Sequence, residues 1–405
     1  MNGGEIALDS LLTRIEAGKS PSAEDSPAGE GEWGVLKVSA VQAGRFASRE
    51  NKVIRDAALI HPRYEVKHGD LLMTRANTEE LVGLACVAEN PPPRLLLSDK
   101  TLRLYVDTAV ADPRFLQLAL AQPTFRQRVR TLATGTSAGM KNIGQEQIRQ
   151  LGVPNLPLGE QRRIVTVNAA FERRIETLEV TLGKLHVVEQ ALSVKALAPA
   201  QLHKWDQVPL ESVATVAAGV TLGSEPVGDG TIELPYLRVA NVLDGRIDTT
   251  DVKRVRILSA QYERYALKQG DLLLTEGGDL DKLGRGAVWD GRIERCLHQN
   301  HVFRVRCRKL MMPDFLALYT ASTAGRAYFQ QVGKQTTNLA SINSTQVKEM
   351  PVPVPPLDEQ EQLLGPVRAV RKRAEALDNQ ITKLRTVQRA VVQELLAGHS
   401  KACAA

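Results

Sequence analysis

Cysteine, aromatic residues and long apolar runs are all scarce in this sequence of 405 residues. Its four cysteines, Cys86, Cys296, Cys307 and Cys403, are too few and too scattered for a disulfide framework, which predicts a reducing compartment. No apolar run is long enough to span a membrane, and the N-terminal residues MNGGEIALDS lack a signal-peptide pattern. We therefore expect a cytoplasmic protein with no membrane partner.

The aromatic and charged residues narrow the class of partner. With 7 Phe, 7 Tyr and 3 Trp, the chain has few of the rings on which single-stranded nucleic acids stack. This scarcity disfavours a single-strand binder but leaves duplex DNA open. The net charge of +6 is mildly basic, which is compatible with a nucleic-acid partner. A length of 405 residues with 43% hydrophobic residues indicates two or three domains, each with its own core.

The sequence contains one long internal repeat. LKVSAVQAGRF (36–46) aligns with LRVANVLDGRI (237–247), and KHGDLLMTR (67–75) aligns with KQGDLLLTE (268–276), both at an offset of 201 residues. Further along, the offset is 199, where Ile143 aligns with Ile342. Several matches in one order at nearly constant offset indicate a duplicated domain pair, because this period is far longer than that of solenoid repeats.

Each copy has a globular part and a helical part. The globular parts carry short alternating runs such as TLRLYV and VFRVRC, which predict strands, with helices expected at 112–131 and 313–331. Proline-rich hinges then lead into long helices. The predicted boundaries are 1–157 and 201–356 for the globular domains, 158–200 and 357–398 for the helices, and 399–405 for a disordered tail.

The two long helices carry apolar residues spaced three or four apart over about four heptads, which is typical of a coiled-coil seam. Such a stripe is too long to be buried inside one domain of this size, so we expect the helices to pair with each other. The predicted fold class is α+β: two duplicated mixed α/β domains joined by two long helices that form an antiparallel coiled coil in a pseudo-twofold arrangement. The predicted seam residues are Ile175, Leu178, Leu182, Leu185, Leu377, Ile381, Leu384 and Val391.

This organisation resembles the specificity (S) subunit of Type I restriction-modification systems. The resemblance covers essentially the whole chain and rests on the combination of GVPNLPLGEQRRIV (152–165), GDLLLTEGGDLDKLGRGAV (270–288) and TTNLASINSTQVKEMPVPVPPLDEQ (336–360). It implies that the globular parts are target recognition domains and that the helices are spacers.

The resemblance also implies a function. A subunit of this family has no catalytic activity of its own. It reads an asymmetric bipartite site on double-stranded DNA and holds two methyltransferase (M) subunits and, in the full complex, the restriction and translocase (R) subunits. No cofactor is then expected in this chain, whereas S-adenosylmethionine, ATP and Mg are expected on the partner subunits.

Candidate DNA contacts lie where variable loops leave the repeated strands. Arg and Lys hydrogen-bond to guanine, Asn pairs with adenine, and Glu or Asp accepts from cytosine. Lys253 and Arg254 belong to a basic run that suits phosphate contacts. For any single position, a phosphate contact or a solvated loop remains an alternative to base contact. The complete set is Arg75, Asn77, Lys100, Lys141, Asn142, Arg238, Asn241, Lys253, Arg254, Glu276, Asp279, Lys282, Arg285, Asn300 and His301.

Two other functional classes are alternatives: a DNA-modifying enzyme with its own active site, and a coiled-coil scaffold that binds proteins. Asn90-Pro91-Pro92-Pro93 is similar to the N-P-P-aromatic motif of adenine methyltransferases, but Pro93 cannot stack on a base. Cys296, His298, His301 and Cys307 suffice on paper for zinc, but the aligned segment of the first copy has no cysteine. No catalytic residues and no metal site are therefore predicted.

Overall fold

The computed structural model describes residues 4–135, 139–223, 226–279, 282–335 and 340–402. The chain divides into two compact units, each containing one globular domain together with parts of both long helices. Unit 1 comprises Met1–Glu179 and Asn379–Ala405, and unit 2 comprises Val180–Asp378. Because each unit takes a part of each helix, this division differs from the predicted boundaries between globular domains and spacers.

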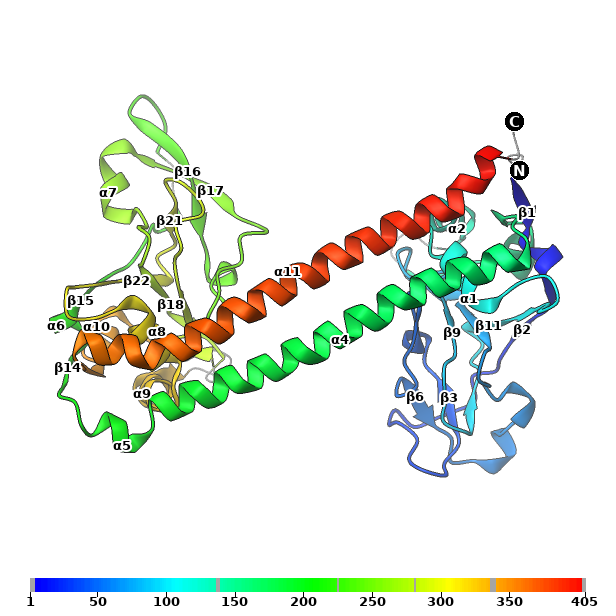
Figure 1. Ribbon diagram of the computed structural model, residues 1–405, viewed down its shortest axis with the longest axis horizontal. Coiled ribbons are helices and arrows are strands. Elements are labelled where there is room, and N and C mark those ends of the chain that lie inside the picture. The colour runs from blue at the N-terminus through cyan, green and yellow to red at the C-terminus, as the bar shows by residue number, and fades with distance from the viewer. Residues whose placement is uncertain (1–3, 136–138, 224–225, 280–281, 336–339, 403–405) are drawn as a thin grey trace. The chain divides into compact units, whose positions relative to one another are not determined.

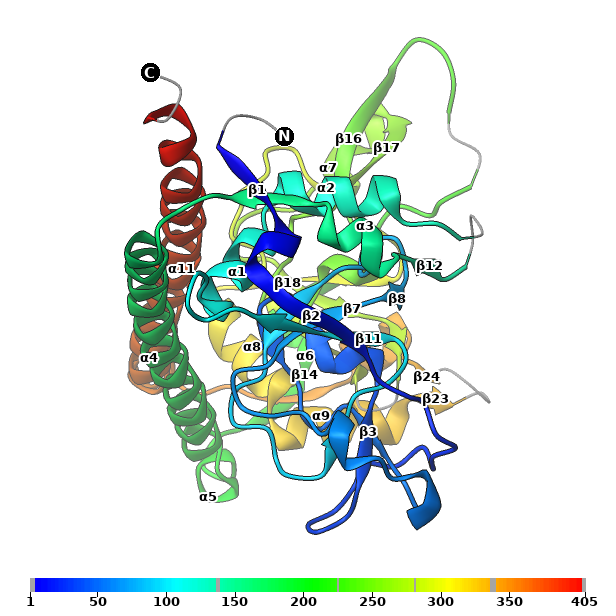
Figure 2. The same ribbon diagram turned by 90° about the vertical axis from the view of Figure 1, so that its right-hand side faces the viewer.

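The centre of unit 1 is an antiparallel sheet of four strands in the order β2-β11-β7-β9 (Figures 1 and 2). A second sheet has the order β10-β3-β6, and β1 pairs with β13, β8 with β12, and β4 with β5. The strands are β1 (Glu5–Ala7), β2 (Leu12–Ala17), β3 (Gly34–Leu36), β4 (Val41–Gln42), β5 (Arg45–Phe46), β6 (Asn51–Val53), β7 (Leu71–Thr74), β8 (Ala76–Asn77), β9 (Ala85–Val87), β10 (Leu95–Leu96), β11 (Thr101–Val106), β12 (Lys141–Asn142) and β13 (Gly152–Pro154).

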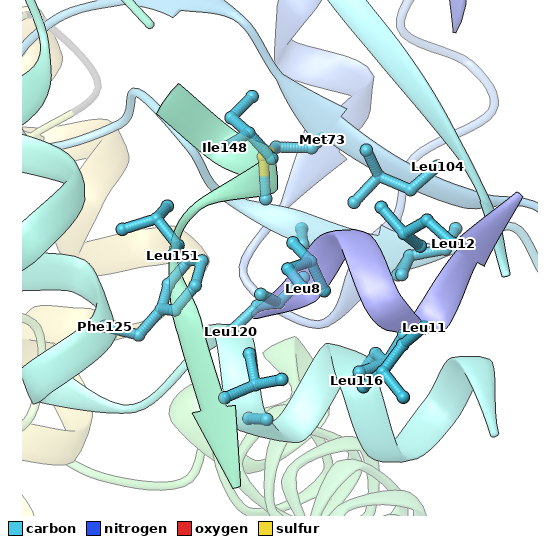
Figure 3. Close-up of a cluster of buried hydrophobic side chains, with 14 of the residues drawn as sticks. Leu8, Leu11, Leu12, Met73, Leu104, Leu116, Leu120, Phe125, Ile148 and Leu151 are labelled. Carbon is cyan, nitrogen blue, oxygen red and sulfur yellow. The ribbon is translucent and has the colours of Figure 1, made fainter. Parts of the chain in front are cut away.

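Both faces of the four-stranded sheet are covered. Met73 and Leu104 point into a cluster that also contains Leu8 and Phe125 (Figure 3), whereas Leu72 points into a second cluster on the other face. The sequence alternation in β11 therefore does not mark a solvated face, because Arg103 is buried as well. The helices of this unit are α1 (Pro113–Leu120), α2 (Pro123–Leu132) and α3 (Gln145–Arg149), with 3-10 turns at Leu8–Leu11, Val38–Ala40, Ala57–Leu59 and Pro62–Tyr64.

The helix predicted over 112–131 is present as the pair α1 and α2. Asp112 caps α1 by accepting hydrogen bonds from the backbone N–H groups of Arg114 and Phe115. Pro123 begins α2, where its missing N–H costs nothing. In unit 2, the helix predicted over 313–331 is likewise divided, and the side chain of Ser322 caps its second half.

Unit 2 repeats this topology, which confirms the predicted duplication. Its four-stranded sheet has the order β15-β22-β18-β20, and Leu272 pairs with Val305 as Leu71 pairs with Leu104. Other sheets are β17-β16-β21, β14-β25 and β19-β24-β23. The strands are β14 (Gln207–Pro209), β15 (Ala214–Ala217), β16 (Thr231–Leu237), β17 (Lys253–Leu258), β18 (Leu272–Thr275), β19 (Gly277–Gly278), β20 (Gly286–Val288), β21 (Leu297–His298), β22 (Val302–Cys307), β23 (Lys334–Gln335), β24 (Ala340–Ser341) and β25 (Pro351–Pro353).

The helices of unit 2 occupy corresponding places in the chain, and its hairpin β16-β17 is longer than the equivalent β3-β6 pair. Six residue pairs join β16 to β17, but only three join β3 to β6. The helices are α5 (Pro199–Leu202), α6 (Leu210–Val213), α7 (Tyr262–Tyr265), α8 (Pro313–Ala321), α9 (Thr323–Val332) and α10 (Ser344–Lys348), with 3-10 turns at Val239–Asn241 and Ser259–Gln261.

The long helices α4 (Leu158–Ala196) and α11 (Leu357–Ala402) pair antiparallel within each unit (Figure 1). In unit 1, Gln388 Nε2 donates to Asn168 Oδ1 at 2.9 Å, and Arg385 pairs with Glu179. In unit 2, Arg371 Nε lies 2.6 Å from Glu189 Oε1. Residue numbers fall along α11 as they rise along α4, as the predicted antiparallel pairing requires.

The helix boundaries agree with the prediction at the start of each helix and differ at its end. Both begin at the predicted residue, but α4 ends at Ala196 and α11 continues to Ala402. The tail predicted to be disordered over 399–405 is therefore helical through Ala402, and its last three residues lie outside the described residues.

The predicted seam follows the buried side of α4 more closely than that of α11. Ile175, Leu178 and Ile381 are buried, whereas the other predicted seam residues, Leu182, Leu185, Leu377, Leu384 and Val391, are half-buried. On α11 the deeply buried positions near the C-terminal end are Val392 and Leu396, one residue beyond the predicted stripe. No helix among the described residues is both long and apolar enough to cross a membrane.

Candidate nucleic-acid interface

The repeated K-x-G-D motif forms the turn that begins the central strand of each sheet. The Asp70 carboxylate accepts a hydrogen bond from the Lys67 backbone N–H at 2.8 Å, and Asp271 accepts from Lys268 at 2.7 Å. The glycine of each turn has a positive φ, +88° at Gly69, which glycine adopts without steric cost. The motif is therefore structural, and the opposite end of the same strand carries the variable residues.

Each turn aspartate is also paired with an arginine of the neighbouring strand, buried Arg103 in unit 1 and half-buried Arg306 in unit 2. In unit 1, Arg103 Nη1 lies 3.3 Å from Asp70, whose pKa is raised by burial. In unit 2, Asp271 is paired instead with Arg306, through two bonds of 2.7 Å. These pairs join the start of β7 to β11 and the start of β18 to β22.

Five predicted contact residues of the first copy converge at the C-terminal end of β7. The backbone N–H of Arg75 donates to the carbonyl of Lys100 at 2.8 Å, and the carbonyl of Arg75 accepts from Ile143 at 3.1 Å. Strand β8 pairs with β12, which sets Asn77 opposite Lys141. The structure thus brings together Arg75, Asn77, Lys100, Lys141 and Asn142, the set that we call the first junction.

The first junction is rich in hydrogen-bond donors and positive charge. Arg75 and Lys100 are exposed, and Lys141 is half-buried with Nζ 3.5 Å from the carbonyl of Gly135. Within the described part of the chain, none of these three cations forms an ion pair. Asn77 accepts from the backbone N–H of Thr78 and so helps to shape the loop.

The same backbone arrangement occurs in unit 2, with different side chains. The backbone N–H of Glu276 donates to the carbonyl of His301 at 3.0 Å, and the carbonyl of Glu276 accepts from Ile342 at 2.9 Å. At the repeat offset of 201, Glu276 corresponds to Arg75 and His301 to Lys100. We call the predicted contact residues gathered here the second junction: Glu276, Asp279, Lys282, Arg285, Asn300 and His301.

The second junction presents acceptors where the first presents donors. His301 Nδ1 lies 2.6 Å from Glu276 Oε2, which leaves Glu276 Oε1 without a partner within the described residues. Asp279 is paired with Lys282, and the backbone carbonyl of Arg285 accepts from Thr275. At the position shared by Arg75 and Glu276, the two junctions therefore have opposite hydrogen-bonding character.

Asn241 does not lie on an accessible surface, contrary to the prediction of a DNA contact. Its side chain is 3% exposed, accepts from the backbone N–H of Arg238 and donates to the carbonyls of Asp248 and Asp251. Arg238 is half-buried and paired with the Asp251 carboxylate at 2.9 Å. Both residues stabilise the turn after β16, a role that the loop position alone does not reveal.

The predicted phosphate-contact residues lie on β17 and are exposed. Lys253 Nζ is 3.2 Å from Asp251, and Arg254 Nη2 donates to the Glu233 carbonyl at 2.8 Å. Lys253 pairs across the sheet with Tyr236, which in turn pairs with Leu297. Leu297 is followed closely by Asn300 and His301 of the second junction. Lys253 therefore lies at the end of this sheet that leads to that junction.

Sequence reasoning missed a cation and a pair of buried amides. Lys334 on β23 is exposed and lies opposite Ser341, which pairs with Gly277, the residue after Glu276 of the second junction. It has no cationic counterpart in the first copy, so the repeat gave no signal. The buried amides are Gln161 and Gln360, which the sequence offered only as part of the shared E-Q phrase.

The cysteines and histidines considered for zinc do not form a metal centre within the described part of the chain, where no group of three or more His, Cys, Asp or Glu residues is so arranged. Burial raises the pKa of the Cys296 thiol to about 12, which disfavours the thiolate that binds metals. The Asn90 segment is a turn, in which the Asn90 N–H donates to His68 Nδ1.

The fold and the two junctions define a class: a duplicated α+β protein whose equivalent loops carry unlike polar groups.

Residues 203–383 match the family model described as the Type I restriction modification DNA specificity domain. The EcoEI specificity subunit of Escherichia coli is 28% identical over 43% of this chain and 30% of its own length. The EcoKI specificity subunit of strain K12 is 22% identical over 67% of this chain and 61% of its own length.

Solved structures share the fold over nearly the whole chain. The S subunit from M. genitalium aligns with a TM-score of 0.54 at 15% identity, over 97% of this chain and 95% of that one. A chain from a structure of the type I R-M system aligns with a TM-score of 0.57 at 17% identity, covering 97% of each chain. The predicted resemblance to Type I specificity subunits is therefore confirmed, although the alignments cover less than two thirds of the EcoEI and EcoKI subunits.

Proposed function

We propose that this chain is the non-catalytic DNA-specificity subunit of a Type I restriction-modification complex. Its two recognition domains each read one half of an asymmetric bipartite target on duplex DNA. The observation that carries this proposal is the pair of junctions, which have equivalent backbone hydrogen bonds but unlike side chains. Equivalent loops with different donors and acceptors select different bases in the major groove.

The partners follow from the same family resemblance. Two methyltransferase subunits dock on the chain, and restriction and translocase subunits join them in the full complex. S-adenosylmethionine, ATP and Mg belong to these partners, which also carry out the chemistry. The relatives named as specificity subunits of restriction enzymes support this division of labour.

The decisive experiment mixes the full-length chain with the methyltransferase subunits of its own system and S-adenosylmethionine, and maps methylated bases on genomic DNA. We expect one motif with two unlike half-sites separated by an unread spacer. Omitting the chain serves as the control and should abolish the motif.

Two outcomes would contradict the proposal. Methylation with no preference for a bipartite sequence would show that the chain does not direct specificity. Methylation by the chain alone would instead favour the alternative of a DNA-modifying enzyme with its own active site.

A further inference from the structure

The two junctions differ most at one matched pair of positions. In unit 1 these positions hold Arg75 and Lys100, which offer only donors, and in unit 2 they hold Glu276 and His301. The backbone hydrogen bond that joins the members of each pair is nearly the same, 2.8 Å in unit 1 and 3.0 Å in unit 2. The side chains therefore leave the fold from equivalent points, so their chemistry is directly comparable.

A carboxylate at this point is incompatible with a phosphate contact. Phosphate oxygens carry negative charge, and in protein–DNA complexes they are bonded by Arg, Lys, hydroxyl, amide and backbone N–H groups. Glu276 would be repelled by a phosphate, whereas it can accept a hydrogen bond from a base edge. If both domains approach DNA with the same surface, the equivalent Arg75 faces base edges as well.

We propose that the two junctions read opposite kinds of base edge. Arg75, with Lys100 beside it, donates to the O6 and N7 acceptors of guanine in one half-site. Glu276 accepts from the exocyclic amino group of cytosine, N4, in the other half-site. This inference rests on the proposed function and adds the identity of the groups that are recognised.

His301 acts as a positioning residue in this arrangement. Its Nδ1 lies 2.6 Å from Glu276 Oε2, and because a carboxylate only accepts, the ring nitrogen is the donor. The bond fixes one carboxylate oxygen and leaves Oε1 as an acceptor with no partner among the described residues. A carboxylate held in one orientation binds a base with a smaller loss of side-chain freedom than a mobile one.

The test transfers the side chains of one junction to the other. The variant Glu276→Arg with His301→Lys, in the full complex with its methyltransferase subunits, gives unit 2 the donors of unit 1. Genome-wide mapping of methylated bases is expected to show a change at one base pair of one half-site, from C to G on the strand that is read. The other half-site is expected to stay the same.

The variant Glu276→Gln covers the case in which the double variant does not assemble. Its amide keeps the size of the side chain but adds donors, so discrimination at that base pair is expected to weaken by roughly 5- to 150-fold or to shift toward adenine. Glu294→Arg, which makes the same change of charge as Glu276→Arg at an exposed loop position, is the control and should leave the motif unchanged.

The outcomes separate this inference from the proposed function. An unaltered motif with Glu276→Gln, in a complex that still methylates a bipartite site, overturns the reading assigned to Glu276 while leaving the specificity role intact. A uniform gain of affinity at all sequences in the double variant, with the motif unchanged, would show that the junction faces phosphate, which also overturns it. If the wild-type complex methylates no bipartite site, the proposed function itself has failed.

Discussion

At the scale of single residues, the two buried glutamines explain why the E-Q phrase occurs in both copies. Gln360 donates through Nε2 to the carbonyls of Leu310 and Pro355 and accepts at Oε1 from the Met312 N–H, at 2.8 to 2.9 Å. Gln161 makes the same three bonds in unit 1. Each glutamine therefore ties the first turn of a long helix to the loop that precedes α1 or α8.

Gln360→Ala is expected to lower the free energy of unfolding by about 3 kcal/mol, because it leaves one backbone N–H and two carbonyls unsatisfied in a buried place. Urea denaturation followed by circular dichroism measures the change. The control is Gln362→Ala, an exposed position two residues further along the same helix. Equal stability of the two variants would contradict the anchoring role.

His298 is the only fully buried histidine in the described part of the chain. Its Nδ1 lies 2.7 Å from the Val302 carbonyl, so Nδ1 is the donor and Nε2 is left without a partner within the described residues. Desolvation lowers the pKa of His298 to about 4. The corresponding residue of the first copy is Leu97, which shows that the site needs no polar group.

This burial makes the stability of unit 2 depend on pH. Unfolding restores an ordinary histidine pKa near 6.5, so between pH 6.5 and 4 the unfolded chain binds a proton that the folded chain does not. The free energy of unfolding has its full value above about pH 6.5 and falls by about 3 kcal/mol as the pH approaches 4. His298→Leu is expected to make the melting temperature nearly independent of pH across this range. His203→Gln, at an exposed position, is expected to leave the pH dependence of the melting temperature unchanged.

At the scale of elements, the long helices were predictable in place and direction but not in helical phase. Leucine and valine spacing identified both helices, and the proline-rich hinges placed their first residues correctly. The stripe on α11 was ambiguous because Val391 and Val392 are adjacent, as are Leu395 and Leu396, and either member of each pair satisfies the spacing. Packing against Ile164 and the core of unit 1 selects Val392 and Leu396.

Ile381→Asp tests the seam of α11 within unit 1. Ile381 is 3% exposed, so a charge at this position would be buried without a partner. We expect the free energy of unfolding to fall by about 3 kcal/mol or more, measured by urea denaturation. Thr382→Asp places the same charge on the exposed neighbour and should change stability by less than about 0.5 kcal/mol. Similar losses in both variants would contradict the assigned seam.

At the scale of the whole molecule, the repeat was the most informative feature of the sequence. It predicted two equivalent domains, and it identified equivalent loop positions, which the structure brings together in each unit. What it did not predict depends on folding of the loop. Asn241 looks like an exposed loop amide in sequence, yet it is buried and hydrogen-bonded to the backbone of Arg238, Asp248 and Asp251. Position after a strand therefore identifies candidates but does not distinguish a ligand contact from a turn-stabilising side chain.

The distribution of positive charge gives two kinds of expected DNA contact. The cations of the first junction lack ion-pair partners within the described residues, whereas Lys253 and Arg254 are exposed and already lie near Asp251 and Glu233. Exposed ion pairs are weak and exchange readily for phosphate, whose contacts position a protein without reading sequence. We therefore expect β17 to contribute affinity and the junctions to contribute selectivity.

Lys253→Ala combined with Arg254→Ala should lower the affinity of the complex for target and scrambled duplexes by the same factor and leave the methylated motif unchanged. Because each phosphate contact releases counterions, the slope of log K against log salt should become shallower by about 1. Two cations without acidic neighbours would change the slope by more, but Asp251 and Glu233 already offset part of the charge of Lys253 and Arg254. Fluorescence anisotropy over a salt series measures both quantities. Lys309→Ala is the control, since Lys309 follows β22 at the end opposite His301. A changed motif in the double variant would instead assign sequence reading to β17.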